Sequence, residues 1–304
     1  MLRPLFLWLA VAALHLSLQG QQDTTGTAPG PYGLFDGNGK ATTFKKLVRQ
    51  SRRSEVVFFG ELHDNATIHR LQQQLAETLY DKTRGNLMMG AEMFQRDDQL
   101  LIDEYLRGVI REKDFEKEAV LWPNYKTDYR PLLRFAKEKQ MPFVATNVPR
   151  RYAAAVARKG EAAFSTFLPE AKAFMAPYPF EFDMELPGYK RILSMGANHG
   201  MANVAFAQAF KDASMAHFIL KDWDTTRVFL HFNGTYHSNH HEGIVWYLKK
   251  WRPRTKIVTI AAVEQKQLDY LDDENLHLAD FIIVVPQKED EEEEKPAPSE
   301  KPQK

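Results

Sequence analysis

Four short apolar segments are each followed at once by polar side chains that can bind ligands or transfer protons. The segments are residues 56–59, 87–91, 142–145 and 227–232. Such short apolar runs are typical of strands buried on both faces of a parallel sheet. Parallel strands end along one edge of their sheet, and ligands bind in the crevice at that edge. The four polar endings therefore predict one shared site.

Helical patterns alternate with these segments. Residues 66–82, 97–110 and 131–139 carry apolar side chains at three- and four-residue spacing, as amphipathic helices do. Two more apolar runs, at 256–260 and 280–285, extend the sheet. Strands that alternate with helices favour right-handed crossovers and parallel pairing. We expect an α/β fold with a mainly parallel central sheet flanked by helices.

A long segment without strand patterns, residues 150–223, interrupts this alternation directly after one of the site-bearing strands. It contains an alanine-rich helical stretch, then prolines among aromatic residues, then a second helical stretch. An insertion at this position predicts a helical lid over the crevice. The lid belongs to one α/β domain, which we place at residues 41–287.

The two ends of the chain differ from this domain. Residues 1–20 hold one arginine before an apolar run that is shorter than the roughly 20 residues of a spanning helix, which predicts a cleaved signal peptide and export to the periplasm or medium. A retained membrane anchor is the alternative. Residues 21–40 predict a flexible lead-in, and the acidic, proline-containing residues 288–304 predict a disordered tail.

The composition of the chain limits which partners and which kinds of site it can have. The 40 basic and 40 acidic residues balance, so no net field favours nucleic acid as a partner. The chain has no cysteine, which excludes disulfides, a thiol nucleophile and a lipid on an N-terminal cysteine. It also lacks the serine-elbow, P-loop and dinucleotide-binding motifs. Any metal site must use His, Glu, Asp, Tyr or Met.

The strand endings supply acid–base candidates. Glu61 and His63 lie two residues apart, so on extended chain they face the same side, where they could transfer protons or bind a divalent metal. Glu92 follows an apolar strand and needs Arg, His or a metal as a partner. The structural alternative is that His63 or Asp64 caps the following helix while Glu61 pairs with a lysine.

Two further candidates follow the later strands. Arg150 comes after Asn147 and could hold a carboxylate or phosphate, or could form a salt bridge to Glu61 or Glu92. His237 follows Gly234, which permits a tight turn. In a hydrolase or metal-dependent enzyme, Glu61 or Glu92 would activate water or bind a metal with His63 and His237, and Arg150 would hold an anionic substrate.

Other residues suggest a flat apolar cofactor. His199 lies in a methionine-containing helical stretch, and Trp122, Tyr125 and Tyr129 form an aromatic cluster. Tyrosine and histidine are both axial ligands of haem, so these residues are candidates to contact it. Plain core packing is the alternative.

Taken together, six segments resemble the ChaN-like haem-binding family, within the group of Tiki, TraB and erythromycin-esterase-like proteins. The resemblance covers roughly residues 40–287. It implies an α/β core with a helical lid, haem or iron uptake in bacteria, a possible homodimer that encloses haem through tyrosine, and an outer-membrane uptake partner. The segments are residues 60–63, 92, 122–131, 147–150, 207–216 and 233–237.

The resemblance leaves two functions open. As a ChaN-like protein, the chain would bind haem, with Tyr125, Tyr129 or Tyr178 as the candidate tyrosine ligand. The esterase- and Tiki-like relatives instead hydrolyse their substrates with residues that match Glu61, His63, Glu92 and His237, and less closely Arg150. The chain departs from the family at Thr235 and Tyr236, where a smaller Gly-His pair is common. A third possibility is an interaction protein that uses the acidic tail.

Overall fold

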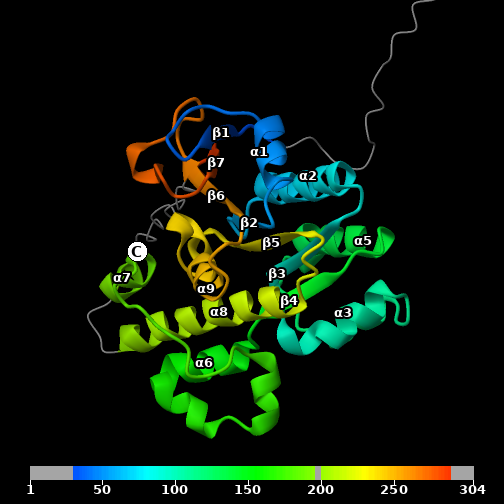
Figure 1. Cartoon of the computed structure of the whole chain (residues 1–304), viewed down its shortest axis with the longest axis vertical. Helices are drawn as coiled ribbons and strands as arrows, with labels where there is room; N and C mark the ends of the chain where they lie inside the picture. Colours follow the sequence, from blue (N-terminus) through cyan, green and yellow to red (C-terminus); the bar gives the residue numbers. More distant parts are fainter. Residues whose placement is uncertain (1–29, 196–199, 289–304) are drawn as a thin grey trace, which may run out of the picture.

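The computed structural model describes residues 30–195 and 200–288, which form a seven-stranded sheet between layers of helices (Figure 1). The strand order is β1-β7-β6-β2-β5-β3-β4, and every neighbouring pair is parallel except β1 with β7. The predicted α/β fold is confirmed. The strands are β1 (Gly33–Asp36), β2 (Val56–Glu61), β3 (Leu87–Gln95), β4 (Phe143–Asn147), β5 (Val228–Gly234), β6 (Ile257–Gln265) and β7 (Phe281–Pro286).

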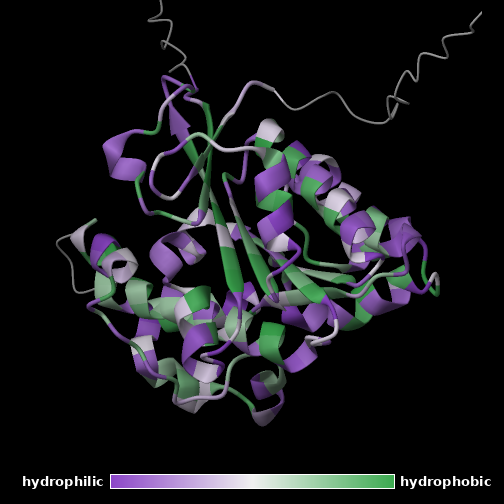
Figure 2. Ribbon diagram, turned by 45° about the horizontal axis from the view of Figure 1, so that its top comes forward, coloured by the Kyte–Doolittle hydropathy of each residue, from purple (hydrophilic) through white to green (hydrophobic). Residues whose placement is uncertain are grey.

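Side chains of the central strands alternate between two apolar layers. In β2, Val57 and Phe59 face one layer, and Val56 and Phe58 face the other. Figure 2 shows the apolar strands at the centre, between helices of mixed polarity. Burying such a side chain stabilises a fold by about 1.5–3 kcal/mol. The first layer contains α1 (Phe44–Ser51), α2 (Ala66–Thr83), α3 (Gln99–Leu106), α4 (Glu112–Glu118) and α5 (Arg130–Glu138), and the second contains α8 (Gly200–Asp222) and α9 (Ile244–Trp251).

The connection from β2 to α2 holds its polar residues at the sheet edge. The Asn65 side chain accepts hydrogen bonds from the backbone N–H groups of Thr67 and Ile68, at 3.1 and 3.2 Å. Asn65 therefore caps α2, and neither His63 nor Asp64 is needed for that purpose. Because only four residues separate β2 from α2, His63 stays beside the strand ends.

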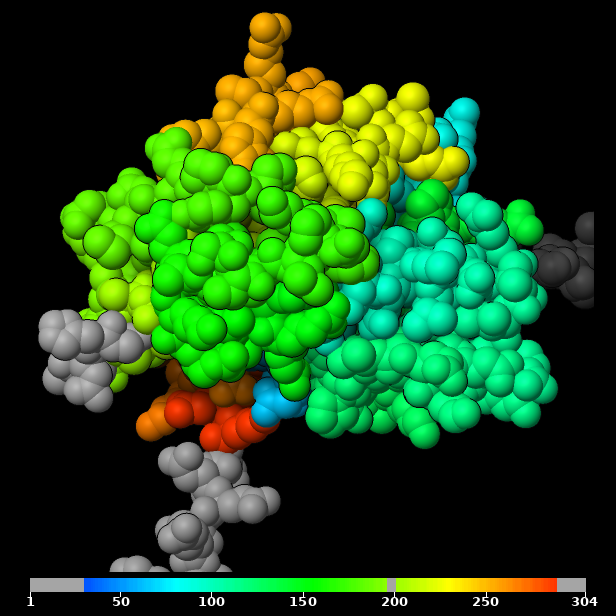
Figure 3. Space-filling model, turned by 90° about the horizontal axis from the view of Figure 1, so that it is seen from below, coloured from blue at the N-terminus to red at the C-terminus, as the bar shows by residue number. Residues whose placement is uncertain are grey.

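The insertion after β4 supplies part of the helical layer on one face of the sheet. It contains α6 (Arg150–Lys159), two 3₁₀ segments, α7 (Pro187–Ser194) and α8. Ala213, Ala216 and Ile219 of α8 pack in one cluster with Val56 and Phe58 of β2, so α8 is part of the layer on that face of the sheet. Figure 3 shows the green segment after β4 at the centre of one face, beside the blue-green segment that contains α3 and α4.

The expected flexible lead-in is partly wrong. Residues 33–36 form β1, because Leu34 and Phe35 are buried and the strand pairs with Phe281–Val284 of β7. The predicted signal peptide and all of the predicted tail beyond Lys288 lie outside the described residues. Within residues 30–195 and 200–288, no helix combines the length and apolarity needed to cross a membrane.

Candidate functional site

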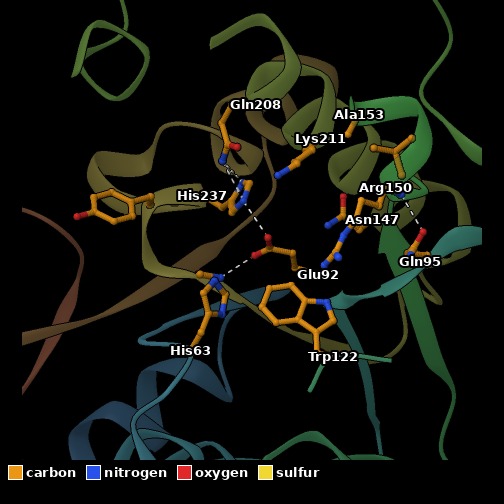
Figure 4. Close-up of a pocket in the computed structure, with 13 residues that line it drawn as sticks. His63, Glu92, Gln95, Trp122, Asn147, Arg150, Ala153, Gln208, Lys211 and His237 are labelled. Carbon is orange, nitrogen blue, oxygen red and sulfur yellow. Dashed lines mark hydrogen bonds and ion pairs between the residues drawn. The ribbon is translucent and has the colours of Figure 1, made fainter. Parts of the chain in front are cut away.

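A polar pocket of about 360 Å³ lies at the carboxyl edge of β2, β5, β3 and β4 (Figure 4). Four of the five acid–base and anion-binding candidates from the sequence line it, and the side chain of the fifth, Glu61, contacts His63. Segments far apart in the chain thus meet at one edge of one sheet. The pocket is lined by His63, Glu92, Gln95, Trp122, Asn147, Val148, Arg150, Ala153, Gln208, Lys211, Gly234, Tyr236 and His237.

Beside the pocket, His237 lies between two carboxylates. Its Nε2 atom is 3.0 Å from Oε1 of Glu92, and its Nδ1 atom contacts Oδ1 of Asp212. The second Asp212 oxygen accepts a hydrogen bond from the hydroxyl of Tyr189, at 2.8 Å. All four side chains are buried. The arrangement fixes the imidazole through both of its nitrogens.

Electrostatics keep His237 charged at neutral pH. Burial alone would lower its pKa, but the charges and hydrogen bonds of Glu92 and Asp212 outweigh burial and raise the pKa to about 10. Burial would raise the pKa of Glu92, but His237, His63 and the Gly234 N–H hold it well below its usual range. Burial raises the pKa of Asp212 despite its contact with His237. The pocket is therefore lined by a buried imidazolium next to an ionised carboxylate.

Each oxygen of Glu92 already has a partner within the protein. Oε1 contacts His237, and Oε2 accepts the Gly234 N–H at 2.7 Å. Glu92 lies inside β3, in a stretch where the register against β4 shifts between Ala91 and Gln95. Irregular pairing of this kind redirects side chains near sites. The main effect of Glu92 is to hold His237.

On the opposite side of the pocket, His63 is oriented by Glu61. Its Nδ1 atom lies 2.8 Å from Oε1 of Glu61, which also accepts the Tyr129 hydroxyl at 2.8 Å. Gln72 donates to the other Glu61 oxygen. Burial lowers the pKa of His63, but the hydrogen bond to Glu61 and the charges of Glu92 and Glu61 raise it overall. His63 and Glu61 form the carboxylate–imidazole pair found in acid–base sites.

The free nitrogen of His63 faces Gly234. A Cβ atom at position 234 would lie only 2.7 Å from Nε2 of His63, so a side chain there would displace the imidazole. The absence of a side chain at this position leaves Nε2 open toward the pocket. His63 also packs against Trp122, with ring centroids 4.8 Å apart.

The tyrosines predicted to bind haem lie in the core or in the insertion and do not line the polar pocket. Tyr125 and Tyr129 are only 3% and 1% exposed, and Tyr129 uses its hydroxyl to hold Glu61. Tyr125 packs against Phe94 and other aromatics in the core. Burial therefore removes both from contact with a surface ligand, which corrects the expectation. Tyr178 contacts Glu161 in the insertion, and His199 lies outside the described residues.

A metal site is not supported in the part of the chain that the structure describes. Its residues contain no group of three or more His, Asp or Glu side chains arranged to hold a metal ion. The donors that could have formed one are paired with each other, as Glu61 is with His63 and Glu92 is with His237.

Residues 207–216 carry part of the family resemblance, but the sequence did not predict that side chains of α8 belong to the site. Gln208, Lys211 and Asp212 all reach the site, and the Gln208 amide lies within 3.1 Å of both ring nitrogens of His237. Their spacing of three and four residues places them on one helix face. Polar residues at this spacing in an otherwise apolar helix were the available signal.

A second pocket, of about 270 Å³, adjoins the first and shares Gln208 and Tyr236 with it. Tyr236 is 67% exposed, and the Arg191 guanidinium lies 6.0 Å from the centre of its ring. The lining is more apolar than that of the polar pocket. It includes Pro187, Arg191, Ile192, Met195, Tyr236 and His240.

Comparison with known proteins gives a family and a fold. The family model described as haem-binding uptake, Tiki superfamily, ChaN matches residues 47–248. No curated protein matches the sequence. A solved structure described as cofacial heme binding to ChaN of Campylobacter jejuni has a TM-score of 0.62 at 16% identity, over 83% of this chain and 96% of that one. An erythromycin esterase, EreC, in its open conformation has a TM-score of 0.47 at 12% identity, over 84% of this chain and 98% of that one.

Proposed function

Because the chain belongs to the ChaN family of haem-binding uptake proteins in the Tiki superfamily, we propose that it is an exported protein that binds haem for uptake or handling. The observation that carries this proposal is the exposed phenol of Tyr236 at the edge of an apolar surface pocket. Export rests on the apolar N-terminal run of residues 5–18. A bound haem would leave part of its surface open, which a second copy or an uptake partner would cover.

The residues around Tyr236 fit a haem group. An axial ligand to haem iron is a phenol, imidazole or thioether, and Tyr236, His240 and Met195 offer one of each on the same pocket. Ile192 gives an apolar contact for the porphyrin face. Arg191 offers a cation for a propionate. When bound, haem would supply an iron centre whose properties depend on this axial ligand.

Titration of the purified protein with hemin, followed by absorption, tests the proposal. We expect a saturable shift of the Soret band, and we expect Tyr236→Phe to weaken binding about tenfold or more, because one ligand-bond contribution of about 1.4 kcal/mol or more is lost. Tyr270→Phe is the matched control, since Tyr270 is also exposed but lies outside both pockets. Equal hemin binding by wild type, Tyr236→Phe and His240→Ala would contradict the proposal.

A second candidate function is hydrolysis in the polar pocket, favoured by the Glu61–His63 pair. Nε2 of His63 would take a proton from water as the water oxygen bonds to the acyl or phosphoryl centre, and would return it to the leaving group as that bond breaks. Glu61 would hold the ring and stabilise its charged form. The Arg150 guanidinium, which also lines this pocket, would stabilise the developing negative oxygen.

The Glu61→Gln variant tests the His63 pair without requiring a known substrate. We expect a lower pKa of His63, since the negative partner of its Nδ1 atom becomes neutral. NMR titration of the His63 ring protons measures this change, and Glu77→Gln, at an exposed site on α2, is the control. An unchanged His63 pKa in a folded Glu61→Gln variant would show that Glu61 does not tune this imidazole.

A further inference from the structure

Two cationic side chains, those of Arg150 and Lys211, line the polar pocket. Among the ion pairs formed by the described residues, none includes the Arg150 guanidinium or the Lys211 ammonium group. The neighbouring Arg151, by contrast, pairs with Asp97 at 2.6 Å. Only the backbone N–H of Arg150 has a bond here, to Oε1 of Gln95 at 2.8 Å. The alternative that Arg150 forms a salt bridge to Glu61 or Glu92 is not what the structure shows.

The two cations come from helices that hold each other in place. Arg150 opens α6 and Lys211 lies on α8, and these helices pack through Ala153, Val156 and Phe210. Figure 4 shows Lys211 on the side of the pocket opposite His63 and Trp122, and Arg150 beside Asn147. A ligand in the pocket would contact both cations as well as the imidazole and the indole.

The Asn147 amide and the Glu92 carboxylate also limit what the pocket can bind. The side-chain oxygen of Asn147 is buried without a hydrogen-bond partner, and rotation of the amide would present its NH₂ group instead. Both oxygens of Glu92, the acidic residue that lines the pocket, are already bonded. The pocket is therefore best suited to bind a group that accepts hydrogen bonds and carries negative charge.

We propose that this pocket binds the oxyanion of a small organic molecule, a phosphate ester or a carboxylate, between Arg150, Lys211 and Asn147. The organic part of the ligand then lies against Trp122 and next to Nε2 of His63. Only the role of His63 toward the bound ligand rests on the proposal that the pocket is hydrolytic. Binding itself requires neither turnover nor haem, so the proposals can fail separately.

Calorimetric titration of the haem-free protein with inorganic phosphate and with phenyl phosphate tests the site. We expect saturable binding of both, tighter for phenyl phosphate because of its contact with Trp122. Arg150→Gln and Lys211→Gln should each weaken binding about tenfold or more, as expected for loss of a charge-assisted contact. Arg158→Gln on α6 and Lys221→Gln on α8 are matched controls, since both side chains are exposed and outside the pocket, and they should bind as wild type does.

Two results would overturn the proposal. One is no saturable binding of either anion to the wild-type protein, or equal weakening in the pocket and control variants. The other concerns the source of the oxyanion, because the propionates of haem have the same chemistry. Saturating phosphate could block hemin binding, and Arg150→Gln and Lys211→Gln could weaken the binding of hemin as much as the binding of phosphate. In that case the two cations bind haem and not a separate ligand.

Discussion

The His237→Gln variant is expected to lose about 3–5 kcal/mol of unfolding free energy, the usual cost of removing one partner from a buried ion pair. His237 is the cation between Glu92 and Asp212, and all three are buried at the same point. Without it, the two carboxylates face each other with no counter-charge, and folding must be coupled to uptake of a proton. Urea denaturation at neutral pH, monitored by circular dichroism, measures the loss.

A triple variant separates charge from packing in this prediction. Replacing Glu92 with Gln and Asp212 with Asn together with His237→Gln removes all three charges while keeping similar volumes. We expect the triple variant to recover most of the stability lost by the single variant. If both variants lose the same amount, shape complementarity and not electrostatics holds this region together.

Acid is expected to destabilise the protein through His231. This histidine is fully buried, between Thr146 at 2.8 Å and Asn233 at 3.1 Å, and burial lowers its pKa to about 4. The unfolded chain takes up the proton near pH 6.5, so the stabilisation is complete above that pH and is lost as pH falls toward 4. For a pKa shift of this size, His231 should lower the free energy of unfolding at pH 4 by about 3 kcal/mol relative to neutral pH.

The His231 contribution can be isolated by comparing variants. His231→Gln should be less stable at neutral pH but should show a flatter decline of unfolding free energy between pH 6.5 and 4. His277→Asn is the control, because His277 is exposed and asparagine tolerates its positive φ of 61°. If the unfolding free energy of His231→Gln declines between pH 6.5 and 4 as steeply as that of the wild type, groups other than His231 cause the acid sensitivity. His237 acts in the opposite direction, since its stabilisation is present below pH 6.5 and is lost as pH rises toward 10.

The strands and their shared edge could be predicted from the sequence because they depend on local pattern. Runs such as residues 56–59 and 281–285 are apolar on both faces, and only a covered parallel sheet accommodates them. The strand β1 was missed because it is four residues long and lies at the edge of the sheet, within a segment of turn-forming residues. Its stability comes from pairing with β7, which no local pattern encodes.

The site was predictable only where function coincides with a strand end. Glu61 ends β2, His63 and His237 lie just beyond β2 and β5, and Glu92 lies three residues before the end of β3, so the topology brings them together. Asp212 lies in the middle of a helix, and its role depends on how α8 packs against the sheet. Aromatic content did not distinguish core tyrosines from exposed ones, because the difference between Tyr129 and Tyr236 is one of tertiary burial.

The structure separates two kinds of binding surface that adjoin at Tyr236. One is the polar pocket, with paired acid–base groups and the cations Arg150 and Lys211. The other is the apolar pocket beside α7, with phenol, imidazole and thioether groups. Our central claim is that haem binds at the second and leaves the first available.

Locating the iron in a crystal of the hemin complex, by its anomalous scattering, tests this claim most directly. We predict an iron peak at bonding distance from the Tyr236 hydroxyl or from another donor of the apolar pocket, with no iron beside His63. An iron peak bonded to His63 or His237 inside the polar pocket would contradict the account.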